Sequence, residues 1–74
     1  MNPTPEKWDT WEYFDPHKKG QPTIATHRIY DIGETEAWCL VIVKADGRSF
    51  KAAYPLIDFT RRDSPYRLAV WTVR

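Results

Sequence analysis

Residues 37–54 read AWCLVIVKADGRSFKAAY and decide the fold of this chain. Every position from Ala37 to Val43 is apolar, which predicts a strand buried on both faces. Asp46-Gly47 then separates this run from a second strand-like run, and Asp-Gly is a strong hairpin signal because the favoured two-residue turn needs positive φ at both positions. The stretch therefore predicts two antiparallel strands, over about 37–45 and 48–54.

A two-residue loop would also fix which side chains share a face of this hairpin. The residues placed opposite each other would be Val43 and Phe50, Val41 and Ala52, and Cys39 and Tyr54. These side chains would form the main core. The opposite face carries Trp38, Leu40 and Ile42 with Lys51 at its margin, so the predicted sheet has a second apolar face that needs a cover.

Two more strands are predicted on either side of the hairpin. Residues 23–32 are rich in β-branched side chains but lack clean apolar alternation, which is typical of an edge strand, and residues 67–74 form a closing strand. Leu56, Ile57 and Phe59 between them predict one helical turn. The predicted fold is α+β and mostly β: a four-stranded antiparallel sheet, with a small barrel as the alternative.

The first 22 residues are predicted to be an arm and linker, with residues 23–74 as the small β domain. Thr4-Pro5-Glu6 is a helix-start pattern, because Thr accepts from exposed backbone N–H groups and Pro suits the first helical position. Asp15-Pro16 ends the helix. Since about ten residues are too few for a stable isolated helix, the arm is either a docked helix or a flexible segment.

The arm also holds most of the candidate partner-binding residues. They are aromatic or acidic, and with Trp38 of the hairpin they comprise Trp8, Trp11, Glu12, Tyr13, Phe14 and Asp15. In one interpretation the aromatic side chains cover the second apolar face of the sheet. In the other they anchor in a groove of another protein while the carboxylates meet its basic rim, and a third possibility is that the arm stays disordered.

A net charge of +1 conceals a separation of charge along the chain. Residues 1–15 contain four carboxylates and one lysine, whereas residues 48–74 contain six cations and two aspartates. The candidate basic patch consists of Arg48, Lys51, Arg61, Arg62 and Arg67. It is a solvated polar face, a track for the phosphates of single-stranded nucleic acid, or a surface that pairs with an acidic protein.

The sequence offers no recognised catalytic, metal-binding or cofactor motif. Cys39 lies in an apolar run and is expected to be a small buried hydrophobe, while His17 and His27 lack a chelating pattern. So short a chain leaves little room for a walled pocket, so we expect no enzyme activity, no metal, no cofactor and no small-molecule substrate. With no signal-peptide pattern and no run long enough to span a membrane, the expected location is the cytoplasm.

The combination of small size, many aromatic residues, separated charge and absent chemistry is similar in general style to small phage-encoded proteins that inhibit or redirect host machinery. Such machinery includes RNA polymerase and defence nucleases. This likeness implies a non-enzymatic, protein-binding regulator or inhibitor. The alternatives are a single-stranded nucleic-acid-binding domain that uses the basic C-terminal half, and a structural subunit that is stable only within an assembly.

Overall fold

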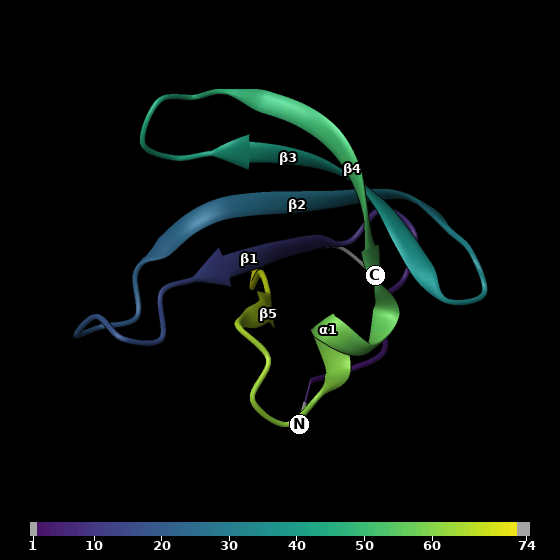
Figure 1. The fold of residues 1–74 in the computed structure, drawn as a ribbon, viewed down its shortest axis with the longest axis horizontal. Helices are drawn as coiled ribbons and strands as arrows, with labels where there is room; N and C mark the ends of the chain where they lie inside the picture. The colour runs from purple at the N-terminus through teal and green to yellow at the C-terminus, as the bar shows by residue number, and fades with distance from the viewer. Residues whose placement is uncertain (1, 73–74) are drawn as a thin grey trace.

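The computed structural model describes residues 2–72, which form one antiparallel sheet and one short helix (Figure 1). The elements are β1 (Thr10–Phe14), β2 (Thr23–Ile32), β3 (Glu36–Val43), β4 (Ser49–Pro55), α1 (Leu56–Thr60) and β5 (Tyr66–Leu68). The strand order is β4-β3-β2-β1-β5, so within the described residues the sheet is open and is not a barrel. The mostly β, antiparallel fold is confirmed, and the predicted count of four strands is wrong because there are five.

The β3–β4 hairpin forms where it was predicted, but its loop is longer than two residues. Residues 44–48 connect the strands, the N–H of Gly47 donates to the carbonyl of Val43 at 2.9 Å, and Gly47 has a φ of 70°, which suits glycine. The observed pairs include Val41 with Phe50 and Cys39 with Ala52. The register thus differs by two residues from the predicted one, and an even shift leaves each side chain on its predicted face.

The N-terminal segment is a strand and not the predicted helix. β1 lies between β2 and β5, where Trp11 pairs with both His27 and Leu68. A turn before the strand is held by the buried carboxylate of Asp9, which accepts from the N–H of Glu6 at 2.8 Å and from the indole Nε1–H of Trp11 at 3.2 Å. Pairing on both sides satisfies the backbone of β1 and buries Trp11 completely, which a short isolated helix does not do.

β2 lies at the centre of the sheet, although the sequence predicted an edge strand there. Its buried side chains are Ala25, His27 and Ile29, and they alternate with Thr26 and the exposed Arg28. The alternation of a central strand is therefore present. It was missed because a histidine occupies an apolar position.

The core lies on the face of the sheet that is turned toward α1, which we call the inner face (Figure 1). The core side chains come from four strands, β1, β2, β3 and β5, and from the helix α1: Trp11, Ala25, Ile29, Ala37, Cys39, Val41, Phe59 and Tyr66. Phe59 packs edge-on against Trp11, with ring centroids 5.4 Å apart. The predicted helical turn at Leu56 to Phe59 is thereby confirmed as α1.

The opposite face, called here the outer face, has no cover of this kind: within residues 2–72, neither a helix nor a further strand packs over it. The closing strand is shorter than the predicted 67–74, because β5 spans Tyr66–Leu68 and the chain then leaves the sheet. Residues 73–74 of that prediction lie outside the described residues. The fold therefore places one packed face and one open face on the same sheet.

Candidate functional site

The outer face carries aromatic and aliphatic side chains with cations among them, which we call the outer patch. Its members are Trp8, Arg28, Tyr30, Trp38, Leu40, Ile42 and Lys51. Strand pairing makes them neighbours, since Arg28 lies opposite Leu40 and Leu40 lies opposite Lys51. The exposed fractions are 56% for Trp8, 42% for Trp38 and 44% for Ile42, so large apolar groups face solvent together.

The cations of the outer patch lie over its rings. The Nζ of Lys7 is 5.3 Å from the ring centroid of Trp8, and the guanidinium carbon of Arg28 is 6.0 Å from it. Lys51 reaches across the sheet, with its Nζ 5.4 Å from the ring centroid of Tyr30. Such contacts are worth about 0.5–1 kcal/mol at exposed sites, which is enough to bias the side chains toward one arrangement.

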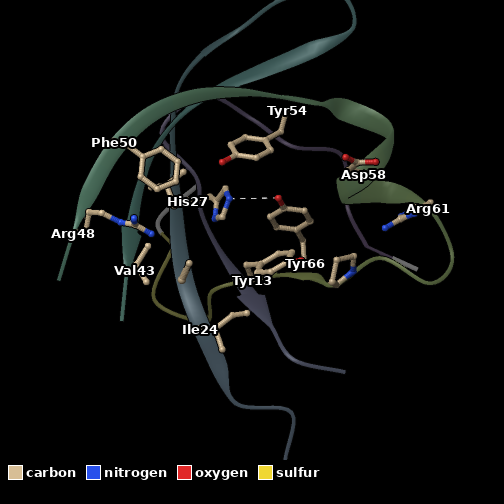
Figure 2. A pocket seen from close by; sticks show the side chains of 13 residues that line it. Tyr13, Ile24, His27, Val43, Arg48, Phe50, Tyr54, Asp58, Arg61 and Tyr66 are labelled. Atoms are coloured by element: carbon tan, nitrogen blue, oxygen red, sulfur yellow. Dashed lines mark hydrogen bonds between the residues drawn. The ribbon is translucent and has the colours of Figure 1, made fainter. Parts of the chain in front are cut away.

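A cleft of about 470 Å³ opens in the inner face beyond the packed core (Figure 2). Aromatic side chains form much of its wall: Tyr13 from β1, His27 from β2, Phe50 and Tyr54 from β4, and Tyr66 from β5. Figure 2 shows Arg48 at the end beside Phe50, and Arg61 with Asp58 at the other end. We call this site the inner cleft. It is an open cleft and not the walled pocket for which so short a chain was expected to leave little room.

His27 lies in the wall of the inner cleft and is only 3% exposed. Its Nε2 is 3.4 Å from the hydroxyl of Tyr66, whereas its Nδ1 has no hydrogen-bond partner in the described structure. The rings of Tyr54 and Tyr66 pack against it, with centroids 4.8 and 5.0 Å away. Burial lowers the pKa of His27 to about 4 and raises the pKa of Tyr66, so both groups are neutral at pH 7.

The predicted arm residues do not form one surface, because strand alternation separates them. Trp11 enters the core and Tyr13 lines the inner cleft, so Trp11 does not cover the apolar outer face. Glu12 accepts a hydrogen bond from the hydroxyl of Thr23 at 2.6 Å and lies 3.4 Å from the guanidinium of Arg67. Of the predicted partner-binding residues, the structure leaves Trp8 and Trp38 exposed on the outer face.

Phe14 is the last residue of β1 and Asp15 follows it, and neither belongs to the outer patch. The guanidinium carbon of Arg67 lies 4.8 Å from the ring centroid of Phe14. Asp15 accepts a hydrogen bond from the backbone N–H of His17 at 2.9 Å, which is a local turn contact. Both residues therefore belong to the sheet margin near β5.

The predicted basic patch is divided among three places. Arg61, Arg62 and Arg67 line a hollow of about 280 Å³. Arg48 lines the inner cleft, and Lys51 lies on the outer face. Arg61 also lines the inner cleft, at the end opposite Arg48, so the hollow is the place within the described residues that holds three of the five.

The remaining reactive group is the thiol of Cys39, which is fully buried as the sequence predicts. Burial raises its pKa to about 12, so the nucleophilic thiolate is not populated near neutral pH. Within residues 2–72, no group of three or more potential ligands is placed to hold a metal ion, and no helix has the length and hydrophobicity needed to span a bilayer.

No protein-family model matches this chain, and neither a curated protein nor a solved structure matches it. The outer patch and the inner cleft therefore carry the functional argument. The sequence contained part of the pattern that indicates each of these two sites. Trp38, Leu40 and Ile42 marked a second apolar face, and the spacing of Ala25, His27 and Ile29 marked His27 as an inward-facing residue.

Proposed function

We propose that this chain is a small non-enzymatic regulator that acts by binding another protein, and that the outer patch is its binding surface. The observation that carries the proposal is the exposure of Trp8 and Trp38 on one sheet face while Trp11 is fully buried. Tryptophan is enriched among the residues that dominate binding energy at protein interfaces. Two tryptophans beside the exposed Ile42 supply the apolar centre of such an interface.

The charges of the outer patch define the chemistry of the partner. Lys7, Arg28 and Lys51 surround or overlie its rings, whereas the carboxylates of Asp31, opposite Trp38, and of Glu36, two residues before Trp38 in β3, lie at one margin. A complementary surface has an apolar depression for the indole rings and acidic side chains around it. The proposed partner is therefore a protein with an acidic rim.

The inner cleft supports a non-enzymatic role as well. His27 and Tyr66 are the titratable pair in contact there, and burial moves their pKa values in opposite directions away from pH 7. General acid–base catalysis is most effective when the pKa of the group lies near the working pH. A pair that is held neutral is better suited to shape a binding site than to transfer protons.

The target of the regulator stays a prediction. The likeness in size and composition to small phage-encoded inhibitors suggests a large host machine, such as RNA polymerase or a defence nuclease complex. Binding of a compact module to such a machine blocks or reshapes it without any chemistry in the module itself.

The proposal is tested by site-specific photo-crosslinking in a host-cell extract. The photoreactive residue p-benzoylphenylalanine replaces Trp38 in one form and Trp71 in a control form, because Trp71 is 58% exposed but is not part of the outer patch. We expect a discrete protein adduct from position 38 that persists at about 0.3 M salt, where surface charge pairs are largely screened. We also expect Trp8→Ala to weaken that adduct. Equal adducts from positions 38 and 71, or adducts that vanish on nuclease treatment, contradict the proposal.

A second candidate function is binding of single-stranded nucleic acid, and the hollow lined by Arg61, Arg62 and Arg67 favours it. Phe14 also lines that hollow, so a base-stacking ring lies beside phosphate-binding cations. Arg67 is already engaged by Glu12, so the test uses the double variant Arg61→Gln, Arg62→Gln. If the candidate is right, oligothymidylate binds with steep salt dependence, and the variant reduces the slope by about 1.4, because each phosphate contact to a single strand contributes about 0.7. If the double variant binds oligothymidylate with the same affinity and salt dependence as the wild type, this candidate function is wrong.

A further inference from the structure

The inner cleft has the size and wall chemistry of a site for a small organic ligand. Its volume of about 470 Å³ lies within the range of about 300–1,000 Å³ that is typical of ligand pockets. Figure 2 shows the rings of Tyr13, Phe50 and Tyr66 arranged around the opening. This site is separate from the outer patch, because strand alternation places the two on opposite faces of the sheet.

The wall favours a flat aromatic ring as the occupant. The rings of Tyr13 and Tyr66 are 5.0 Å apart with an interplanar angle of 58°, and those of Tyr13 and His27 are 5.9 Å apart at 42°. Tilted rings at these distances present both faces and edges to a further ring, and aromatic groups prefer offset and edge-on contacts of this kind. An aliphatic ligand of equal size gains the burial but not these contacts.

The ends of the inner cleft carry an excess of positive charge. Arg48 lies at one end, with its guanidinium carbon 5.8 Å from the ring centroid of Phe50. Within residues 2–72 it forms no ion pair. Arg61 lies at the other end, beside Asp58, and its Nε is 3.8 Å from the carboxylate of Asp63. Arg48 is therefore the cation that is left to pair with a ligand, and guanidinium binds a carboxylate through two parallel hydrogen bonds.

The wall of the cleft also contains a buried polar atom without a partner, the Nδ1 of His27. Leaving such an atom unpaired destabilises the fold, and native proteins keep few of them. An imperfectly satisfied polar group next to a cleft is more typical of a binding site than of a core that is optimised for stability alone.

The geometry points to the inner cleft as a binding site for a small planar aromatic acid. Its ring lies among Tyr13, Phe50 and Tyr66, and its anionic group pairs with Arg48. The inference does not depend on the outer patch, and it replaces the expectation from the sequence that the chain binds no small molecule.

The test is a titration of the full-length chain with three probes of matched size, followed by two-dimensional amide NMR. The probes are 2-naphthoate, 2-naphthylmethylamine, which has the same rings with a positive charge, and decahydro-2-naphthoate, which has the same carbon skeleton and charge without the aromatic rings. We expect 2-naphthoate to bind saturably and to shift amide signals of residues that line the cleft, together with the side-chain nitrogens of His27. Both other probes are expected to bind at least about tenfold more weakly.

Two variants locate the site. Arg48→Gln is expected to weaken 2-naphthoate binding about tenfold, because it removes the cation that pairs with the carboxylate of the probe. Arg48 is exposed and lies outside the strands, so the substitution should leave the fold intact. Lys51→Gln is the matched control, since it removes the same charge from the outer face of the adjacent strand. Trp38→Ala should leave the affinity unchanged, which separates this test from that of the proposed protein-binding role. Non-saturable binding, equal affinity for the amine, insensitivity to Arg48→Gln, or shifts confined to the hollow around Arg62 would overturn the inference.

Discussion

Replacing Trp11 with alanine is expected to unfold this domain, whereas replacing Trp8 is expected to leave it folded. The two tryptophans are close in sequence, but Trp11 is fully buried and Trp8 is 56% exposed. The ring of Trp11 packs edge-on against Phe59, and its indole N–H donates to the carboxylate of Asp9. The pair therefore compares a core residue with a surface residue of the same type.

The magnitude follows from what Trp11 contacts. Truncating a buried tryptophan to alanine costs about 3–5 kcal/mol. The carboxylate of Asp9, which is 1% exposed, then loses one donor, and that adds about 1–3 kcal/mol. A core in a domain of this size supplies only about 3–5 kcal/mol, so the total exceeds the stability of the fold. Trp8→Ala removes cation–π contacts with Lys7 and Arg28 and costs about 0.5–1 kcal/mol.

Urea unfolding followed by far-UV circular dichroism, with amide NMR dispersion as a check, measures these effects. We expect Trp11→Ala to show collapsed dispersion without denaturant. Trp11→Phe keeps a ring and is expected to lose about 1–3 kcal/mol; with a slope of about 1 kcal/mol per molar urea, its midpoint falls by about 1–3 M. A dispersed spectrum for Trp11→Ala, with a midpoint within about 0.5 M of Trp8→Ala, would refute the assignment of Trp11 to the core.

Three further predictions concern pH, the thiol and the hairpin loop. Burial holds the pKa of His27 at about 4, below its ordinary value of 6.5, so the unfolded chain binds this proton more tightly. The stability contribution is full above about pH 6.5 and is lost as the pH falls toward 4, so urea midpoints between those values should fall more steeply for the wild type than for His27→Phe. Cys39 should not react with a thiol reagent at about pH 8 until denaturant is added, and fast reaction of the folded chain contradicts its burial. Gly47→Ala should cost about 1 kcal/mol through its φ of 70° alone, since no atom lies within 4 Å of the added methyl group, and an unchanged urea midpoint contradicts this.

The parts of the fold that depend on local sequence were predictable. The apolar run from Ala37 to Val43 and the turn residues after it are adjacent in the chain, so the hairpin follows from pattern alone. Its loop length does not follow, because Asp46-Gly47 is compatible with both a two-residue connection and the longer one that is observed. The even difference between the two registers preserved the assignment of faces.

The N-terminal segment was mispredicted because its structure is set by distant residues. Thr4-Pro5-Glu6 has the local features of a helix start, but β1 pairs with β2 and with β5, and those contacts outweigh the local preference. The inner cleft was missed for the same reason. Tyr13, His27, Phe50 and Tyr66 come from four different strands, and no spacing along the chain indicates that their rings meet.

The separation of charge along the chain is not a separation in space, and this changes the partner chemistry that we propose. The sequence suggested an acidic, aromatic arm that meets a basic rim on another protein. In the structure, the carboxylate of Asp9 accepts hydrogen bonds within the turn before β1, and that of Glu12 contacts Thr23 and Arg67. These carboxylates therefore stabilise the fold itself. The charged groups that lie over the exposed ring of Trp8 are Lys7 from the arm itself and Arg28 from β2. An arm that is acidic in sequence thus contributes a cation to the outer patch, and for this reason we propose an acidic surface on the partner.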